Sequence, residues 1–350
     1  MAFGKPGSMG RGTGKQGAAH LGRAAASTPA WVMSGASADV DFANNRAWVS
    51  GLGVVSISTL IAISRASNET DLLWTSASGA AYNTFGSDAL ALNSGGLNIY
   101  GAATNLLLNS TVPATQTVTL SATGNYTLWV NGSGSAAIAA GTATITGAGT
   151  ATNGTPVTIN CTATGTITVT VTGSLNAFQL ESGTFGTPLI ITAGVSATRA
   201  ADNITLGTTL NNLWVNQTAG WASMRASSPN QVVNILSRLL DTNSGAAQFQ
   251  ISGSATNRGA MNRNSANAVT TANAYTAGTT LQMSGTWSAL AMAISLNQGT
   301  VVSGTPAAFT SGTTNLGNRA DLARPWSGAI QRLVLGSTTL SNAALQALSP

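Results

Sequence analysis

Alternating apolar and small polar residues are the main feature of the middle of the chain. Between residues 114 and 183, runs such as ATQTVTLSATGNYTLWV and TPVTINCTATGTITVTV place apolar side chains at alternate positions, with Thr or Ser between them. Alternation of this period is typical of strands with one buried face. Gly and Asn separate the runs at spacings of about ten residues, which favours an antiparallel β-sandwich or jelly roll over a parallel sheet.

The alternation also predicts which side chains fill this core. A shift of one residue would bury the threonines instead, so the pattern specifies the register. The lone cysteine belongs to the inward set, where a small buried hydrophobe is the commoner role, and one cysteine allows no intramolecular disulfide. The predicted inward residues are Val118, Leu120, Leu128, Val130, Ile159, Cys161, Ile167, Val169 and Val171.

Shorter apolar runs flank the middle region on both sides. Residues 39–97 predict short strands and loops, and the most apolar stretch, residues 48–63, is too interrupted by Gly, Ser and Thr to span a bilayer. Further strands are expected within residues 210–216, 246–253, 279–285, 288–302 and 326–336. Helices are expected only from Asn230 to Leu240 and after Ser341, which has the residue type of an N-cap.

Charge is scarce, and its distribution suggests three parts. Only 7% of the residues are charged, where globular domains average roughly 25%, and residues 89–180 carry no charged side chain. The hydrophobic fraction of 43% still predicts a folded chain. Weak charge is typical of proteins whose many copies stand side by side, so we expect a homo-oligomer. Charge returns near residue 199, which suggests an arm (1–38), a first sandwich region (39–202) and a second sandwich (203–350).

The first 38 residues are basic and rich in Gly and Ala. Lys5, Arg11, Lys15 and Arg23 precede the first acidic residue, Asp39. Two interpretations stay open, a disordered tail or an anchor that becomes ordered on docking to a partner. The segment lacks the continuous apolar stretch of a secretory signal, so we expect no export by the general secretion route.

The residue types that catalysis needs are few. The single histidine, His20, lies in the arm, so a hydrolytic triad is not expected. The nine acidic residues offer Glu69 and Asp71 as the nearest pair in sequence, and this pair resembles a solvated turn more than a glycosidase cleft. We therefore expect no enzyme, no bound metal, no cofactor and no nucleic-acid partner.

Three segments resemble the head-spike-fibre domain of tailed phages and gene-transfer agents. The first, residues 96–147, has the ordered blocks GLNI, ATNLLLNS, TQTVT and YTLWV. The second, residues 178–202, contains FQLESG and TRAAD, and the third, residues 63–72, contains SRAS. Residues 203–350 resemble a concanavalin A-like or laminin-G-like sandwich in SLNQGTVV and WSGAIQRLVLG. These resemblances imply a structural protein at the surface of a virion, with capsid or other virion proteins as partners.

The second sandwich has residues that could contact a glycan. Aromatic rings stack on sugars and polar side chains bind hydroxyls, so the candidates are Trp221, Arg225, Arg258 and Arg263. Arg258 and Arg263 are expected in a polar loop, whereas Trp287 and Trp326 lie in apolar runs and are expected in the core. If the arm is the tether, the domain furthest along the chain faces outward.

The resulting hypothesis is a head spike or fibre that is anchored by its arm and contacts host-surface polysaccharide through residues 203–350. A tail fibre or receptor-binding protein is the alternative within the same class. A bacterial surface-layer protein or adhesin is the alternative outside it, since such proteins share the weak charge and the Thr-rich strands. Neither alternative is excluded by the residues, and no membrane insertion is expected.

Overall fold

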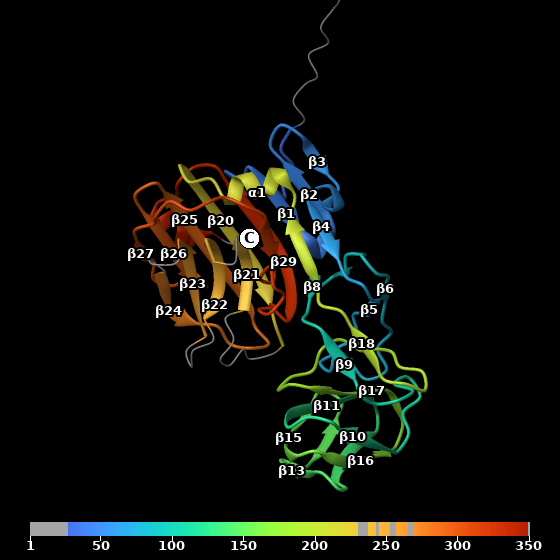
Figure 1. The fold of residues 1–350 in the computed structure, drawn as a ribbon. Coiled ribbons are helices and arrows are strands. Elements are labelled where there is room, and N and C mark those ends of the chain that lie inside the picture. The colour runs from blue at the N-terminus through green and yellow to red at the C-terminus, as the bar shows by residue number, and fades with distance from the viewer. Residues whose placement is uncertain (1–26, 230–236, 243–244, 253–256, 265–268, 349–350) are drawn as a thin grey trace, which may run out of the picture.

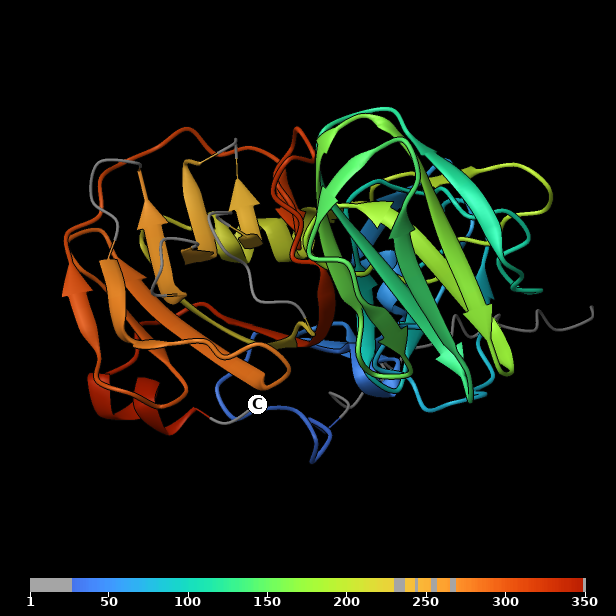
Figure 2. The ribbon, with the colours of Figure 1, turned by 90° about the horizontal axis from the view of Figure 1, so that it is seen from below.

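The computed structural model describes residues 27–229, 237–242, 245–252, 257–264 and 269–348. Within these ranges nearly all regular structure is β-strand, and the strands pair antiparallel in facing sheets. The predicted all-β class is therefore confirmed. Figures 1 and 2 show a larger body, here called the platform, and a smaller one, here called the inserted domain.

The platform consists of two facing sheets. The first has the order β27-β26-β25-β20-β29-β1-β2-β3, with β8 also pairing with β29 and β7 with β8. Its strands are β1 (Ala38–Asp41), β2 (Arg46–Val49), β3 (Gly53–Val55), β7 (Leu92–Asn93), β8 (Gly96–Ile99), β20 (Ala219–Ser227), β25 (Thr280–Ser288), β26 (Met292–Leu296), β27 (Val302–Gly304) and β29 (Gly328–Gly336).

The second sheet has the order β24-β23-β22-β21-β28-β19-β4. Its strands are β4 (Ile61–Ser64), β19 (Asn203–Leu206), β21 (Ser237–Thr242), β22 (Ala247–Ser252), β23 (Arg258–Arg263), β24 (Val269–Ala274) and β28 (Thr314–Leu316). Apolar side chains from both sheets form one core. At its centre the Trp214 ring lies edge-on to Phe249 and Trp287, with centroids 5.1 and 5.3 Å away. Trp287 and Trp326 are buried, as predicted.

The inserted domain is a second sandwich with its own core. One sheet is β10 (Gln116–Leu120), β16 (Gly165–Thr172), β12 (Ser135–Ala140) and β14 (Thr150–Thr152); the other is β13 (Thr144–Thr146), β15 (Val157–Ala163), β11 (Gly124–Gly132) and β17 (Leu175–Ser182). The predicted register is confirmed, because every residue of the inward set is buried except Val171, which is partly buried and packs against the same core.

A narrow region, here called the neck, joins the two bodies. It comprises residues 65–89, 100–105 and 184–202, and its strands are β5 (Glu69–Thr70), β6 (Thr84–Phe85), β9 (Ala103–Asn105) and β18 (Ala197–Arg199). β9 pairs with β18, and β5 pairs with β6. Residue 103 therefore lies opposite residue 199, and the inserted domain leaves and rejoins the neck at adjacent points.

Strand pairing divides the chain differently from the predicted boundaries at residues 38 and 202. β1 lies between β29 and β2, and β4 pairs with β19, so residues 38–64 belong to the same sheets as residues 203–348. Val40 on β1 is fully buried in the platform core. The physical reason is that these short N-terminal strands complete their sheets only with strands made much later, β1 with β29 and β4 with β19, as the Ser37 to Leu335 hydrogen bond illustrates.

Two local predictions are wrong and one is confirmed. Residues 210–216, predicted as a strand, form most of α1 (Thr208–Trp214) and its C-terminal end. Residues 237–240, predicted as helix, lie in β21, and residues 230–236 fall outside the described residues. The predicted C-terminal helix is α2 (Asn342–Ala347), where the Ser341 hydroxyl accepts from the Ala344 amide as an N-cap.

Three smaller points complete the description. Short 3₁₀ helices η1 (Phe42–Asn44) and η2 (Ile57–Thr59) connect the N-terminal strands. Residues 48–63 contain strand and turn, as predicted. No helix in the described ranges is both long and apolar enough to cross a bilayer.

The discontinuous platform gives a first prediction. Replacing residues 104–198 by a short Gly-Ser linker should leave a platform that unfolds cooperatively, because the two cut ends lie side by side in the β9–β18 pair. A fragment of residues 203–350 should not unfold cooperatively, because it lacks β1, β2, β4 and β8. Urea unfolding followed by near-UV circular dichroism measures both. Cooperative unfolding of the 203–350 fragment would contradict the observed strand order.

Candidate functional site

The four basic residues of the arm, Lys5, Arg11, Lys15 and Arg23, lie outside the described residues. The described end of the arm, residues 27–38, is held against the first platform sheet. Arg46 places its guanidinium 4.5 Å from the Trp31 ring centroid, and Arg332 donates to the Trp31 carbonyl at 2.7 Å. Arg332 is in turn paired with the buried Asp39 at 2.7 Å. The arm therefore starts from the platform.

The predicted glycan residues do not form one site. Trp221 and Arg225 belong to β20 in the first sheet, whereas Arg258 and Arg263 belong to β23 in the second. Arg225 and Arg258 are exposed, but Trp221 is 1% exposed. Its indole lies so close to β29 that a Cβ at Gly336 would sit 1.9 Å from its Nε1. Trp221 is therefore a packing residue, and its predicted glycan role is wrong.

Arg263 is also buried, and it lies in a strand instead of the predicted loop. Its guanidinium lies 4.2 Å from the Trp287 ring centroid and donates to the carbonyls of Trp214 and Asn216, at the end of α1. Burial lowers the pKa of Arg263 to about 9. The contacts fasten α1 to the second sheet, so the side chain has a structural role that its sequence position did not reveal.

The densest group of charged side chains lies in the neck. Arg65 Nη1 donates to Glu69 at 2.9 Å and to Asp202 at 2.7 Å. Its other nitrogens donate to the carbonyls of Ser67, Gly86 and Ala89, so its five N–H donors face five acceptors. The side chains of Arg65, Glu69 and Asp202 are fully buried. A buried charge of this kind is tolerated because its donors and acceptors are matched.

A second arginine completes the group, which we call the neck cluster: Arg65, Glu69, Arg199 and Asp202. Arg199 lies 3.4 Å from Glu69 Oε1, donates to the Gly101 carbonyl and covers the Tyr100 ring at 5.1 Å. Asp202 also accepts from the Tyr100 amide at 2.8 Å. Segments from three distant parts of the sequence are thus held at one point between the platform and the inserted domain.

Glu69 is the unusual member of the neck cluster. Its desolvation by burial, helped by the nearby Asp202, raises its pKa to about 8 despite the attraction of Arg199 and Arg65. Its Oε1 atom and the Nε and Nη1 atoms of Arg199 have no hydrogen-bond partner. The expectation of a solvated turn at Glu69 is therefore wrong, and its neighbour Asp71 instead accepts hydrogen bonds from Asn83.

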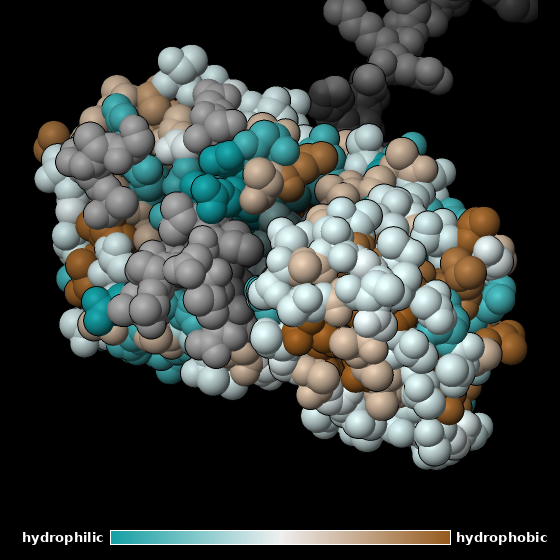
Figure 3. Space-filling model, turned by 60° about the horizontal axis from the view of Figure 1, so that its bottom comes forward, coloured by the Kyte–Doolittle hydropathy of each residue, from teal (hydrophilic) through white to brown (hydrophobic). Residues whose placement is uncertain are grey.

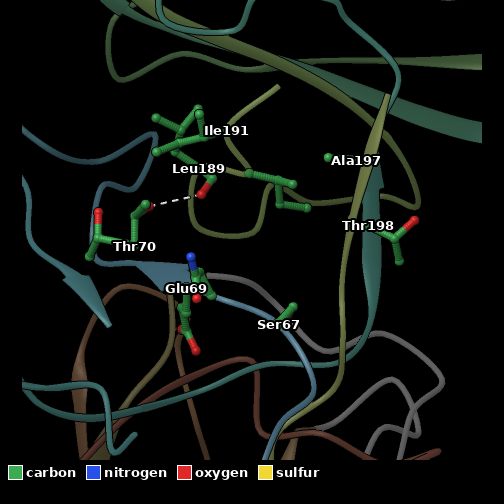
Figure 4. Close-up of a pocket in the computed structure, with 10 residues that line it drawn as sticks. Ser67, Glu69, Thr70, Leu189, Ile191, Ala197 and Thr198 are labelled. Atoms are coloured by element: carbon green, nitrogen blue, oxygen red, sulfur yellow. Dashed lines mark hydrogen bonds between the residues drawn. The ribbon is translucent and has the colours of Figure 1, made fainter. Parts of the chain in front are cut away.

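A hollow of about 360 Å³ opens on the surface beside the neck cluster. It is lined by residues 67–70, by Leu189–Ile191 and by Ala197 and Thr198, and Thr70 closes one side by donating to the Leu189 carbonyl at 2.8 Å (Figure 4). The carboxylate of Glu69 points away from Leu189 and Ile191 in this view. The hollow therefore presents hydroxyl, amide and apolar groups, and no charged side chain points into it.

In the described part of the chain, no three His, Cys, Asp or Glu residues come together in a group that could hold a metal ion.

The neck cluster was not identified as a unit from the sequence. A usable signal was nevertheless present, because its four charges interrupt an almost uncharged chain within the segments 63–72 and 198–202.

Comparisons with known proteins assign neither a family nor a function to this chain. No family model and no curated protein matches the chain. Among solved structures it is similar to one described as the Ruminococcus gnavus IT-sialidase CBM40 bound to α2,6-sialyllactose, with 12% identity and a TM-score of 0.31. The match covers 37% of this chain and 82% of that one. An overlap of this size assigns no ligand to this chain.

The raised pKa of Glu69 gives a prediction about stability and pH. The folded state keeps the Glu69 proton up to about pH 8, whereas an unfolded chain loses it near 4.5, so the free energy of unfolding falls as the pH rises through this window. Glu69→Gln resembles the protonated acid and should remove most of the fall. The measurement is the thermal midpoint of both proteins across the window.

Asp202→Asn is a second test. It leaves Arg65 with a neutral partner in place of its closest carboxylate, and should lower stability by about 3–5 kcal/mol. Because Asp202 helps to raise the pKa of Glu69, this variant should also reduce the fall in stability with pH. Equal pH dependence of the wild-type and Glu69→Gln midpoints would contradict the assignment of the proton to Glu69.

Proposed function

We propose that this chain is a non-enzymatic structural protein of a bacteriophage-type particle, a head spike or fibre. The observation that carries the proposal is the neck. The three segments that resemble head-spike-fibre proteins, residues 63–72, 96–147 and 178–202, all reach it and supply the four members of the neck cluster and Tyr100. The residues that carry the resemblance therefore connect the platform to the inserted domain. A spike needs such a connection to hold its projecting part away from its base.

The use of acidic residues supports a structural role over a catalytic one. All nine Asp and Glu residues are among the described residues, and each is held by an arginine or by hydrogen bonds from its own surroundings. Glu69 and Asp202, which share Arg65, are both fully buried. A glycosidase needs an accessible carboxylate pair across its substrate. The ion-paired residues are Asp39, Asp41, Glu69, Asp202, Asp241 and Asp321, and the hydrogen-bonded ones are Asp71, Asp88 and Glu181.

The structure changes which part of the molecule faces outward in this proposal. The arm begins beside β1 and β2 on the platform, so the domain at the end of the chain is also the domain nearest the tether. The inserted domain lies at the opposite end from β2 and β3 (Figure 1). A particle anchored by the arm would therefore present the inserted domain furthest from its shell, and not residues 203–350 as the order along the chain suggested.

Removal of the arm tests the particle role. Particles are produced in cells whose own copy of the gene is replaced by variants, and incorporation is measured by quantitative mass spectrometry of purified particles. Deleting residues 2–26 should abolish incorporation and leave the thermal midpoint unchanged, because the contacts of Trp31 remain. Replacing residues 104–198 by the Gly-Ser linker should preserve incorporation. Normal occupancy of the arm-deleted protein, or absence of the full chain from any particle, would refute the proposal.

Glycan contact by the platform is the second part of the proposal, and we assign it to a part of the surface away from Trp221. A hollow of about 130 Å³ is lined by Gln217, Arg263, Ser288 and residues 306–309. Gln217 and Phe309 are partly exposed there, whereas Arg263 is buried and lies 5.1 Å from the Phe309 ring centroid. An amide and an aromatic ring are groups that hold sugar hydroxyls and faces. We place the contact here because Trp221 is buried and Arg258 lies on the opposite end of β23.

Filling this hollow tests the glycan contact without disturbing the core. Ala307 is exposed at the rim, so Ala307→Trp should block the hollow and leave the thermal midpoint unchanged. Binding to an immobilised glycan array should fall by roughly tenfold or more. Arg258→Ala, at an exposed position away from the hollow, is the matched control and should bind normally. Loss of binding only in Arg258→Ala would move the contact to the Arg258 end of β23, and the absence of binding by the wild-type chain would remove this function.

A further inference from the structure

The surface of the inserted domain carries no charged side chain. Between Asp88 and Arg199 the sequence has one ionisable carboxylate, Glu181. That carboxylate is fully buried and accepts hydrogen bonds from Gln179 and from the amide and hydroxyl of Thr187. In Figure 3 the inserted domain is mostly white, with brown areas that mark hydrophobic residues. Soluble monomers usually cover such a surface with charges that oppose association.

Four exposed apolar side chains lie on two loops where the inserted domain meets the neck, and hydrogen bonds join these loops; we call the four the apolar patch. Leu108 and Val112 come from the loop before β10 and are 39% and 73% exposed. Ile191 and Val195 come from the loop before β18 and are 44% and 68% exposed. Ile191 also lines the hollow beside the neck cluster (Figure 4). Large exposed hydrophobic residues gathered in this way mark a contact surface more often than single ones do.

Buried polar side chains hold the two loops of the patch together. The Ser110 hydroxyl accepts from the Thr192 amide at 2.9 Å, and the Thr192 hydroxyl donates to the Leu107 carbonyl at 2.7 Å. Asn109 accepts from the Gly194 amide at 2.8 Å. Ser110 and Thr192 are both almost fully buried. The patch is therefore fixed before any partner arrives, so little conformational entropy is lost when it is covered.

We propose that the apolar patch binds the inserted domain of a second copy of this chain. A partner rich in charge would have its charges desolvated against a surface that offers no opposite charge, which is unfavourable. A partner that is itself uncharged and apolar avoids this cost, and the inserted domain is such a surface. Contact between copies would bury Val112 and Val195 with a gain of about 25 cal/mol for each Å² of apolar surface removed from water. Neighbouring copies would then associate where the inserted domain meets the neck.

Sedimentation velocity of the full chain, up to about 100 μM, tests this inference. The wild-type protein should form a concentration-dependent oligomer that persists in about 1 M NaCl, because salt screens charges and leaves apolar contact intact. The double variant Val112→Lys, Val195→Lys should dissociate, with the dissociation constant raised by at least roughly tenfold. Both lysines replace exposed side chains, so the thermal midpoint should not change.

Leu290→Lys is the matched control, since this leucine is 83% exposed on the platform between β25 and β26. It adds a lysine outside the patch and should oligomerise like the wild type. A wild-type chain that stays monomeric throughout the concentration range would overturn the inference. So would an oligomer that survives Val112→Lys, Val195→Lys or that dissociates in Leu290→Lys. The result is independent of the particle role, which is measured by incorporation.

Discussion

The arrangement of the two sandwiches depends on one buried guanidinium. Arg65 has acceptors from three segments around it, at residues 67–69, 86–89 and 202. A cation in an interior costs several kcal/mol unless each donor finds an acceptor, so the segments must meet in one arrangement for the charge to be tolerated. The neck also has apolar contacts, because Leu72 and Leu189 form a small core with Trp129 and Ala177 of the inserted domain. The directional bonds of Arg65 add to these contacts and restrict the relative position of the bodies further than hydrophobic contact alone would.

Charge is used in the interior and is scarce outside. The neck cluster, the Arg332–Asp39 pair and the Arg238–Asp241 pair bury most of their charge. The exposed surface of the inserted domain is left to Thr, Ser, Ala and Gly. Such a molecule has weak electrostatic repulsion from its copies, and also little long-range attraction to charged partners. Its contacts with other molecules depend on shape and short-range chemistry.

Local pattern was sufficient for the inserted domain, although none of the strands in its two sheets pairs with the next strand in the sequence. The period-two alternation from Val118 to Val169 specified both the sandwich and its register, because one face of each strand is apolar and the other is Thr. It was insufficient for the platform. Nothing in residues 38–41 indicates that their partner is residues 332–335, since a strand's alternation does not identify which strand it pairs with.

The burial of the predicted glycan residues could not be derived from the local sequence pattern either. Trp221 and Arg263 have the composition of a sugar site, yet their places on β20 and β23 bury both, and burial depends on what covers each sheet face. Residues 210–216 look like a strand by composition but form α1, because Trp214 turns into the space between the sheets. Tertiary packing overrode local preference in both cases. The resemblance segments identified the residues of the neck without showing that they form a charge cluster.

The platform's discontinuity has a consequence for the order in which the chain folds during synthesis. The inserted domain pairs strands that are close in sequence and can form as soon as it leaves the ribosome. The first platform sheet is complete only after β29 has been synthesised, because Arg332, which pairs with Asp39, comes 293 residues later in the chain. Until then β1 can pair with β2, but its other edge and its apolar face lack their partner strands. During synthesis the inserted domain is therefore folded while the platform is still incomplete. A chaperone that protects the first platform strands would affect the yield of folded protein more than any change to the inserted domain.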